Sequence, residues 1–198
     1  MSSFDDKDEV SIKILDTAQA LFQEYGIEDV SMHQVAQASG IGQGTLYRRF
    51  PSKNMLCLSL MQNKFQQFMK RTEAYLHSEQ AVSAEQKLTT VVSNFLLLAG
   101  EDLEWIKQIM RTDRVRDTKV NCFELPPFIF IRDHVQSLLE EAAAEQKLKD
   151  VDPFFTACMI ATGLTPEKIA YLNDEGYSIE DIADHYCQSF ILPLFTEE

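Results

Sequence analysis

The stretch from Ser31 to Lys53, SMHQVAQASGIGQGTLYRRFPSK, constrains the fold of this chain most. Ser31 and the glutamine three residues later form a capping box, which begins a helix. Gly40 can take the positive φ that ends such a helix. A second helix over about residues 43–50 follows at once and ends before Pro51, because the residue that precedes a proline avoids helical backbone. Two short helices joined by a tight turn containing glycine predict a helix-turn-helix.

Acidic residues are absent from this segment and from the residues that follow it up to Thr72, although the net charge of the whole chain is −13. There is no Asp or Glu in residues 30–72, and the basic residues there are Arg48, Arg49, Lys53, Lys64, Lys70 and Arg71. A chain of this charge repels nucleic acid, and the absence of acids removes that repulsion locally. A solvated helix face is the alternative explanation. The helix-turn-helix pattern in the same segment favours contact with DNA.

Composition and periodicity predict an all-α protein of about nine helices. Hydrophobic residues make up 45% of the 198 residues, which is enough for a real core, and Gly and Pro are few. Besides the helix-turn-helix, apolar residues recur at helical spacing from Ile14 to Tyr25 and over about residues 53–76, 88–99, 103–112, 128–142, 153–171 and 179–194. Ser52, Asp152, Thr165 and Ser178 are the predicted caps. Residues 113–127 are predicted to be mainly a loop.

Targeting and redox features predict a cytoplasmic protein. No apolar run approaches the roughly 18 residues of a membrane span, and the acidic N-terminus lacks the pattern of a signal peptide. The four cysteines are far apart and form no metal-binding spacing. We therefore expect no metal, no cofactor and no contact with a membrane.

Residue types in the helix-turn-helix indicate how it contacts DNA. Gln43 and Arg48 are types that read adenine and guanine in the major groove, with a plain surface position as the alternative. Gly44 allows close approach to DNA. Types that bind phosphate occur at Ser31, Thr45, Tyr47 and Lys53. For Tyr47 a place in the core is the alternative, whereas Leu46 and Phe50 are expected in the core. We expect His33 to be solvated or to face a phosphate rather than act as a switch.

Residues 10–56 resemble the DNA-binding domain of the tetracycline-repressor (TetR) family of bacterial regulators. The resemblance rests on Ala18, Leu21, Phe22 and Gly26, on Val35-Ala36 and Gly40-Ile41 around the turn, on the run from Gly44 to Phe50, and on Lys53 and Leu56. It implies a homodimer that binds a pseudo-palindromic operator in double-stranded DNA, with Tyr47 and Lys53 against phosphates. The predicted domains are residues 1–53 for DNA binding and 54–198 for ligand binding and dimerisation.

Two residues depart from the family pattern. Gly42 stands where serine is frequent, which predicts a weaker cap on the helix that follows. Arg49 stands where histidine or tyrosine is common. Arg49 is therefore predicted either to add a DNA-phosphate contact or to lie against its own helix.

For the acidic C-terminal part, the resemblance implies a ligand cavity and a dimer interface built from the last two helices. The candidates for the cavity lining are Phe95, Trp105, Met110, Phe123, Phe128, Phe154 and Met159, with a plain core position as the alternative for each. Acids close to these aromatic residues suit a lipophilic cation, whereas Arg111, Arg114 or Arg116 suits an acylated or other anionic ligand. The candidates for the dimer interface are Ile179, Ile182, Ala183, Tyr186 and Phe190. Packing within their own subunit is the alternative, and both can hold at once because the helix has more than one apolar stripe.

These observations predict a DNA-binding transcriptional regulator. In the leading hypothesis it is a homodimeric repressor, and a small hydrophobic ligand favours a dimer whose recognition helices are wrongly spaced for successive major grooves. The alternative is a DNA-bound organiser or activator that acts through a protein partner without a small-molecule inducer. An enzyme is not expected, because the sequence has no nucleophile elbow, phosphate-binding glycine loop or metal-ligand spacing.

Overall fold

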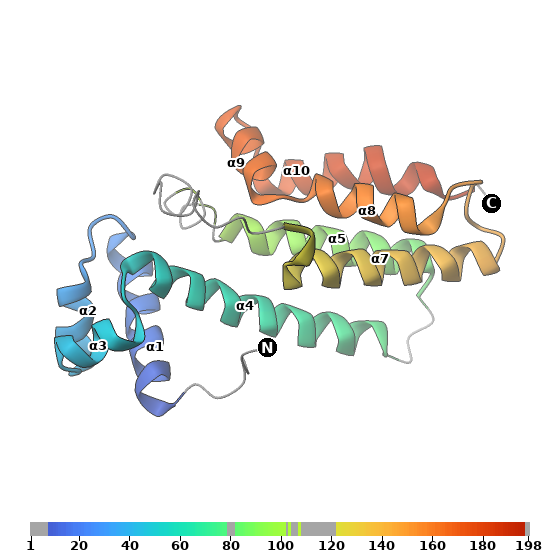
Figure 1. Cartoon of the computed structure of the whole chain (residues 1–198). Coiled ribbons are helices and arrows are strands. Elements are labelled where there is room, and N and C mark those ends of the chain that lie inside the picture. Colours follow the sequence, from blue (N-terminus) through green and yellow to red (C-terminus); the bar gives the residue numbers. More distant parts are fainter. Residues whose placement is uncertain (1–7, 79–81, 102, 104–106, 108–121, 197–198) are drawn as a thin grey trace. The chain divides into compact units, whose positions relative to one another are not determined.

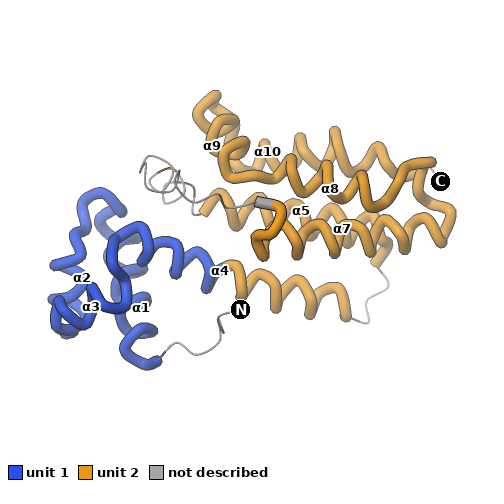
Figure 2. Tube along the Cα trace, viewed as in Figure 1, with its two compact units in different colours: residues 1–64, 108–112 blue, residues 65–107, 113–198 orange. Residues whose placement is uncertain are grey.

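The computed structural model describes residues 8–78, 82–101, 103, 107 and 122–196 (Figure 1). These residues are predominantly helical, and the β structure among them is a single antiparallel bridge between Leu148 and Phe195. The predicted all-α fold is therefore confirmed. The chain divides into two compact units (Figure 2): unit 1 contains residues 1–64 and 108–112, and unit 2 contains residues 65–107 and 113–198.

Some predicted features lie outside the described residues. They are most of the predicted helix over residues 103–112 and the side chains of Trp105, Met110, Arg111, Arg114 and Arg116. The predicted domain boundary after Lys53 coincides with the first residue of helix α4, whereas the two units divide later, after Lys64. Among the described residues, none of the helices has the length and apolar character needed to cross a membrane.

Unit 1 contains α1 (Glu9–Tyr25), α2 (Met32–Ser39), α3 (Gln43–Arg49) and the beginning of α4 (Lys53–Leu76). Helix α1 begins earlier than the apolar pattern indicated, because the side chain of Asp8 accepts a hydrogen bond from Ser11 N at 2.8 Å and caps the helix. The apolar faces of these helices form one core, which includes Ile14, Leu15, Ala18, Phe22, Val35, Leu46 and Leu56.

The two ends of α2 and the start of α3 form as the sequence predicted. Ser31 N donates to Gln34 Oε1 at 2.7 Å, and Gln34 N donates back to Ser31 Oγ at 3.3 Å, which completes the capping box. Gly40 ends α2 with a φ of 65°, in the left-handed region that glycine adopts readily. Gly42 precedes α3 and supplies no side-chain cap, as expected.

Unit 2 contains the rest of α4 with α5 (Ala84–Glu101), α7 (Pro126–Ala144), α8 (Pro153–Gly163), α9 (Pro166–Asp174) and α10 (Ile179–Tyr186). Helix α10 continues as a π-helix (Cys187–Ile191) and a 3₁₀ turn (Leu192–Leu194), and a 3₁₀ turn (Cys122–Glu124) precedes α7. Helix α7 packs against both α5 and α8, and α5 packs against α10, so that two layers enclose the core (Figure 1).

Capping in unit 2 follows the sequence prediction with one exception. Asp152 accepts a hydrogen bond from Phe155 N at 2.6 Å at the start of α8, and Ser178 forms a capping box with Asp181 at the start of α10. Thr165 occupies the N-cap position of α9, as predicted, but its side chain makes no capping hydrogen bond. Pro166 begins that helix, and a proline at the first helical position needs no partner for the N–H that it lacks.

Candidate nucleic-acid interface

Helix α3 presents a polar face to solvent and an apolar face to unit 1. Gln43, Gly44 and Arg48 are exposed, and Tyr47 is 47% exposed, which excludes a place in the core for Tyr47. On the opposite face Leu46 is fully buried, as predicted, and it ties the short helix to the core. A rigid helix with an exposed polar face is the element that enters the major groove in a helix-turn-helix protein.

Arg48 and Arg49 are neighbours in sequence but differ in their contacts. Within the described residues, Arg48 makes no hydrogen bond or ion pair. The guanidinium of Arg49 donates from Nη2 to Asp8 Oδ2 at 2.6 Å and from Nε to Ser11 Oγ at 3.2 Å. Neither alternative predicted for Arg49 describes this arrangement, in which the residue joins the end of α3 to the start of α1.

The contact with Arg49 also changes the acidity of Asp8. Hydrogen bonds from Arg49 first, and from the backbone N–H of Ser11 second, lower the pKa of the Asp8 carboxyl to about 2. The carboxylate is therefore charged at neutral pH and holds both the guanidinium and the first turn of α1.

Lys53 makes contacts that differ from the phosphate contact predicted for it. Its ammonium Nζ lies 2.6 Å from Ile27 O, 2.9 Å from Val30 O and 3.3 Å from Glu28 O. A lysine ammonium has three N–H groups, and here each has a carbonyl acceptor. Lys53 thus fastens the loop between α1 and α2 to the first turn of α4. No sequence pattern indicates this contact, because the acceptors are backbone carbonyls, which every residue has.

The remaining predicted residues lie on or beside the turn. Ser31 Oγ is engaged with Gln34 Oε1 at 2.7 Å, and Thr45 is half-buried in α3. The carboxamide Nε2 of Gln43 forms a hydrogen bond with Nδ1 of His33, and both side chains are exposed. Helices α2 and α3 are therefore linked by a side-chain contact on their solvent-exposed side as well as by the buried core.

Comparison with known proteins identifies this arrangement. Residues 14–60 match the family model of bacterial regulatory proteins of the tetR family. A transcriptional regulator of the TetR/AcrR family from Thermobifida fusca has the same fold, with a TM-score of 0.69 at 17% identity over 93% of this chain and 98% of that one. Residues 14–60 therefore belong to the tetR family of bacterial regulatory proteins, and the whole chain has the fold of its TetR/AcrR-family neighbour.

Two further similarities extend the comparison beyond the TetR family model. An HTH-type transcriptional regulator of Staphylococcus aureus is 36% identical over 92 residues, which are 43% of this chain and 50% of that protein. The chain thus spans about half the length of this relative. The transcriptional regulator FadR from Bacillus subtilis, solved in complex with stearoyl-CoA, shares the fold with a TM-score of 0.61 at 24% identity, over 91% of this chain and 97% of that one.

The described candidates for a TetR-type ligand cavity lie in three separate environments. Phe95 packs in a cluster with Phe65, Phe68 and Phe130, whose ring centroids lie 5.8–6.4 Å apart. Phe123 is exposed and packs edge-on against Phe128, at 5.2 Å between centroids. Phe154 and Met159 are exposed on α8. Phe95 and Phe128 thus both pack against the core of unit 2, whereas Phe123, Phe154 and Met159 are exposed.

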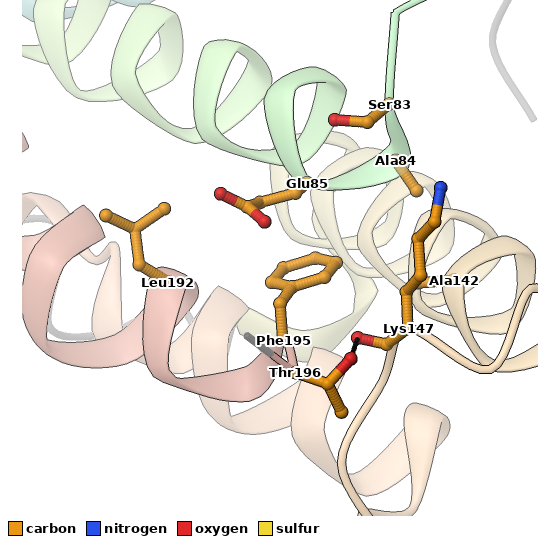
Figure 3. A pocket seen from close by; sticks show the side chains of 8 residues that line it. All are labelled: Ser83, Ala84, Glu85, Ala142, Lys147, Leu192, Phe195 and Thr196. Atoms are coloured by element: carbon orange, nitrogen blue, oxygen red, sulfur yellow. Dashed lines mark hydrogen bonds between the residues drawn. The ribbon is translucent and has the colours of Figure 1, made fainter. Parts of the chain in front are cut away.

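A pocket of about 340 Å³ opens elsewhere in unit 2, and Figure 3 shows the side chains around it. It is lined by Ser83, Ala84, Glu85, Ala142, Lys147, Leu192, Phe195 and Thr196. None of these residues was a sequence candidate. Their positions come from the start of α5, the end of α7 and the C-terminal turn, and no local sequence pattern connects these segments.

The candidates for the dimer interface lie mostly inside unit 2. Ile182 and Ala183 are buried in its core, and Tyr186 donates a hydrogen bond to Ile160 O at 2.8 Å. Ile179 packs so closely on Gly100 that a Cβ there would lie 2.5 Å from Ile179 Cγ2. For these four residues the alternative of packing within the subunit holds. Phe190, the fifth, is 58% exposed.

Sequence reasoning missed one exposed apolar residue beside this region, whereas it had assigned two others to the ligand cavity. On α8, Phe155 is 65% exposed, Met159 56% and Phe154 54%. The composition of α8 could have indicated that Phe155 has a partner. The helix is apolar on every side, and such a helix is stable only when every side is buried against other protein surfaces.

Proposed function

We propose that this protein is a homodimeric transcriptional repressor that binds a pseudo-palindromic operator in double-stranded DNA and leaves it when a small hydrophobic ligand binds. The observation that carries the proposal is the polar face of α3, which is exposed on a rigid helix-turn-helix within a segment free of acids. Both DNA and a small ligand of this kind are available in the cytoplasm, where we place the protein.

The DNA contacts are divided among the residues of the turn and α3. Gln43 and Arg48 read base edges, since both side chains are exposed and belong to the types that recognise adenine and guanine. Gly44 allows the backbone of α3 to approach the groove. Ser31, Thr45 and Tyr47 contact phosphates. Arg49 and Lys53 hold unit 1 together, because their cationic groups already bind Asp8 and backbone carbonyls.

The dimer forms through the exposed apolar face of α8, with Phe190 of the π-helix at its side. Phe154, Phe155 and Met159 form this face, and large exposed apolar patches mark association surfaces. Covering the aromatic rings with the same face of a second copy makes the contact symmetric. A two-fold dimer presents two α3 helices to half-sites that are about 34–36 Å apart.

A long acyl thioester is the first ligand to test, because the Bacillus subtilis neighbour was solved in complex with stearoyl-CoA. Such a ligand releases the repressor only if it binds the form that cannot reach both half-sites more tightly. The alternative function, an organiser or activator without a small-molecule inducer, uses the same α3 and predicts no effect of any acyl thioester on DNA binding.

The test is a mobility-shift titration with DNA from upstream of the protein's own gene, at two salt concentrations and with excess competitor DNA. Selective binding of two subunits per site that weakens steeply with salt supports the repressor. Release by stearoyl-CoA, but not by free coenzyme A, supports an acyl inducer, whereas unchanged binding favours the organiser. Equal binding of all DNA sequences would contradict an operator-specific regulator.

A further inference from the structure

The contact between His33 and Gln43 carries an inference about how the operator is read. Nε2 of Gln43 and Nδ1 of His33 form a hydrogen bond that joins α2 to α3, and both side chains are exposed. Gln43 is the first residue of α3, where the preceding Gly42 has no side chain to contact it. The hydrogen bond to the imidazole therefore fixes the position of this carboxamide in the free protein.

We propose that His33 is a positioning residue that holds the Gln43 carboxamide ready to read an adenine. This proposal rests on the DNA-binding function proposed above. It gives His33 a role that acts through Gln43, in place of the phosphate contact expected from its residue type.

Counting donors and acceptors shows how the contact serves recognition. When Gln43 Nε2 donates to Nδ1, the imidazole is neutral and its own proton is on Nε2. The carboxamide keeps one N–H and its oxygen. These are the two groups that pair with adenine, the N–H with N7 and the oxygen with the N6 amino group. The histidine thus occupies the one donor that an adenine does not need.

Positioning matters because a glutamine side chain is long and flexible. Immobilising such a side chain at an interface costs conformational entropy, which weakens binding. A hydrogen bond that already holds the side chain in the free protein makes this entropy loss smaller. The gain is confined to the base that Gln43 reads. Loss of His33 should therefore weaken the preference at one operator position by roughly 2- to 10-fold and leave the other positions unchanged.

The experiment selects bound sequences from a random DNA pool with the full chain and five variants. The variants are His33→Ala, His33→Asn, Gln43→Ala, the double variant of His33→Ala with Gln43→Ala, and Gln37→Ala as a control for loss of an exposed polar side chain from α2. We expect Gln43→Ala to lose the adenine preference at one position of each half-site. His33→Ala should weaken the same preference, and Gln37→Ala should leave it intact.

Two comparisons separate positioning from direct contact. His33→Asn should restore the preference, because the amide Oδ1 of Asn is as many bonds from the backbone as Nδ1 of His and also accepts a hydrogen bond. In the Gln43→Ala background, His33→Ala should change nothing further. The proposal is overturned if the two effects add, or if His33→Ala lowers affinity for all sequences equally.

Nitrogen NMR of the free protein tests the contact without DNA. If Gln43 Nε2 donates to it, His33 Nδ1 should have the shift of an unprotonated acceptor, and Gln43→Ala should change that shift. A shift that Gln43→Ala leaves unaltered would overturn the positioning role even if operator binding holds. A wild-type chain that enriches no sequence would instead overturn the DNA-binding function together with the specificity assigned to His33.

Discussion

Helices α3 and α8 are both short, and both expose the residues to which we assign function, but what they expose is opposite. Helix α3 presents Gln43, Tyr47 and Arg48, which water solvates well in the free protein. Helix α8 presents Phe154, Phe155 and Met159, which water does not solvate well. A polar face is stable in water and can bind a charged partner transiently. An aromatic face is stabilised when another protein surface buries it permanently. The difference assigns DNA to α3 and a second copy to α8.

The largest expected effect concerns the aromatic face. Phe155→Glu should raise the dimer dissociation constant by about 30- to 1,000-fold, because losing an aromatic anchor costs about 2–4 kcal/mol. Operator binding should fall with it, since one subunit reaches one half-site. Sedimentation and mobility shift measure the two effects. Tyr171→Glu, at an exposed aromatic residue of α9, is the matched control. A Phe155→Glu protein that remains a dimer would remove α8 from the interface.

On the polar face, Arg48→Ala should weaken operator binding by about 1–3 kcal/mol and relax the preference at one base pair. The reason is that the Arg48 guanidinium is exposed and makes no contact inside the described part of the chain. A titration against operators changed at single positions measures both effects. An affinity equal to that of the parent at every position would show that α3 does not lie in the groove as proposed.

Lys53 is a cation of unit 1 that does not belong to the exposed polar face. Its ammonium group binds backbone carbonyls and stabilises the unit. Lys53→Met should lower the free energy of unfolding by roughly 1–2 kcal/mol, since it leaves the carbonyls of residues 27, 28 and 30 without their charged donor. Denaturant unfolding measures this change. The salt dependence of DNA binding should be unaltered. A stable variant whose salt slope falls by about one would return Lys53 to the phosphate contacts.

The smallest effect concerns the ion pair of Asp8 with Arg49. The carboxyl pKa is lowered to about 2 in the folded protein, below its ordinary value of 3.8. Its contribution to stability is therefore present above pH 4 and is lost as the pH falls from about 4 to 2. Asp8→Asn should melt at a slightly lower temperature than the parent at pH 6, and this difference should shrink as the pH falls from about 4 toward 2. A difference that stays constant over that range would show that the pair is not its cause.

The sequence predicted unit 1 better than unit 2 at the level of single side chains. In unit 1 the capping box of Ser31, the left-handed Gly40 and the buried Leu46 are confirmed. In unit 2 the helices are confirmed among the described residues, but Ile182 and Ala183, predicted for the dimer interface, pack in the core. Apolar periodicity predicts which residues are buried away from solvent. It does not tell whether the same subunit, a second subunit or a ligand covers them.

The sequence by itself determined where α2, α8 and α10 begin, because in each the cap and its partner lie three residues apart in one local segment. Only the tertiary structure decided the roles of Arg49 and Lys53. Arg49 binds Asp8 across 41 positions, and the carbonyl acceptors of Lys53 are 23 to 26 positions away. A cation in a sequence has many possible partners, and its role depends on which acceptor the fold brings within hydrogen-bond distance.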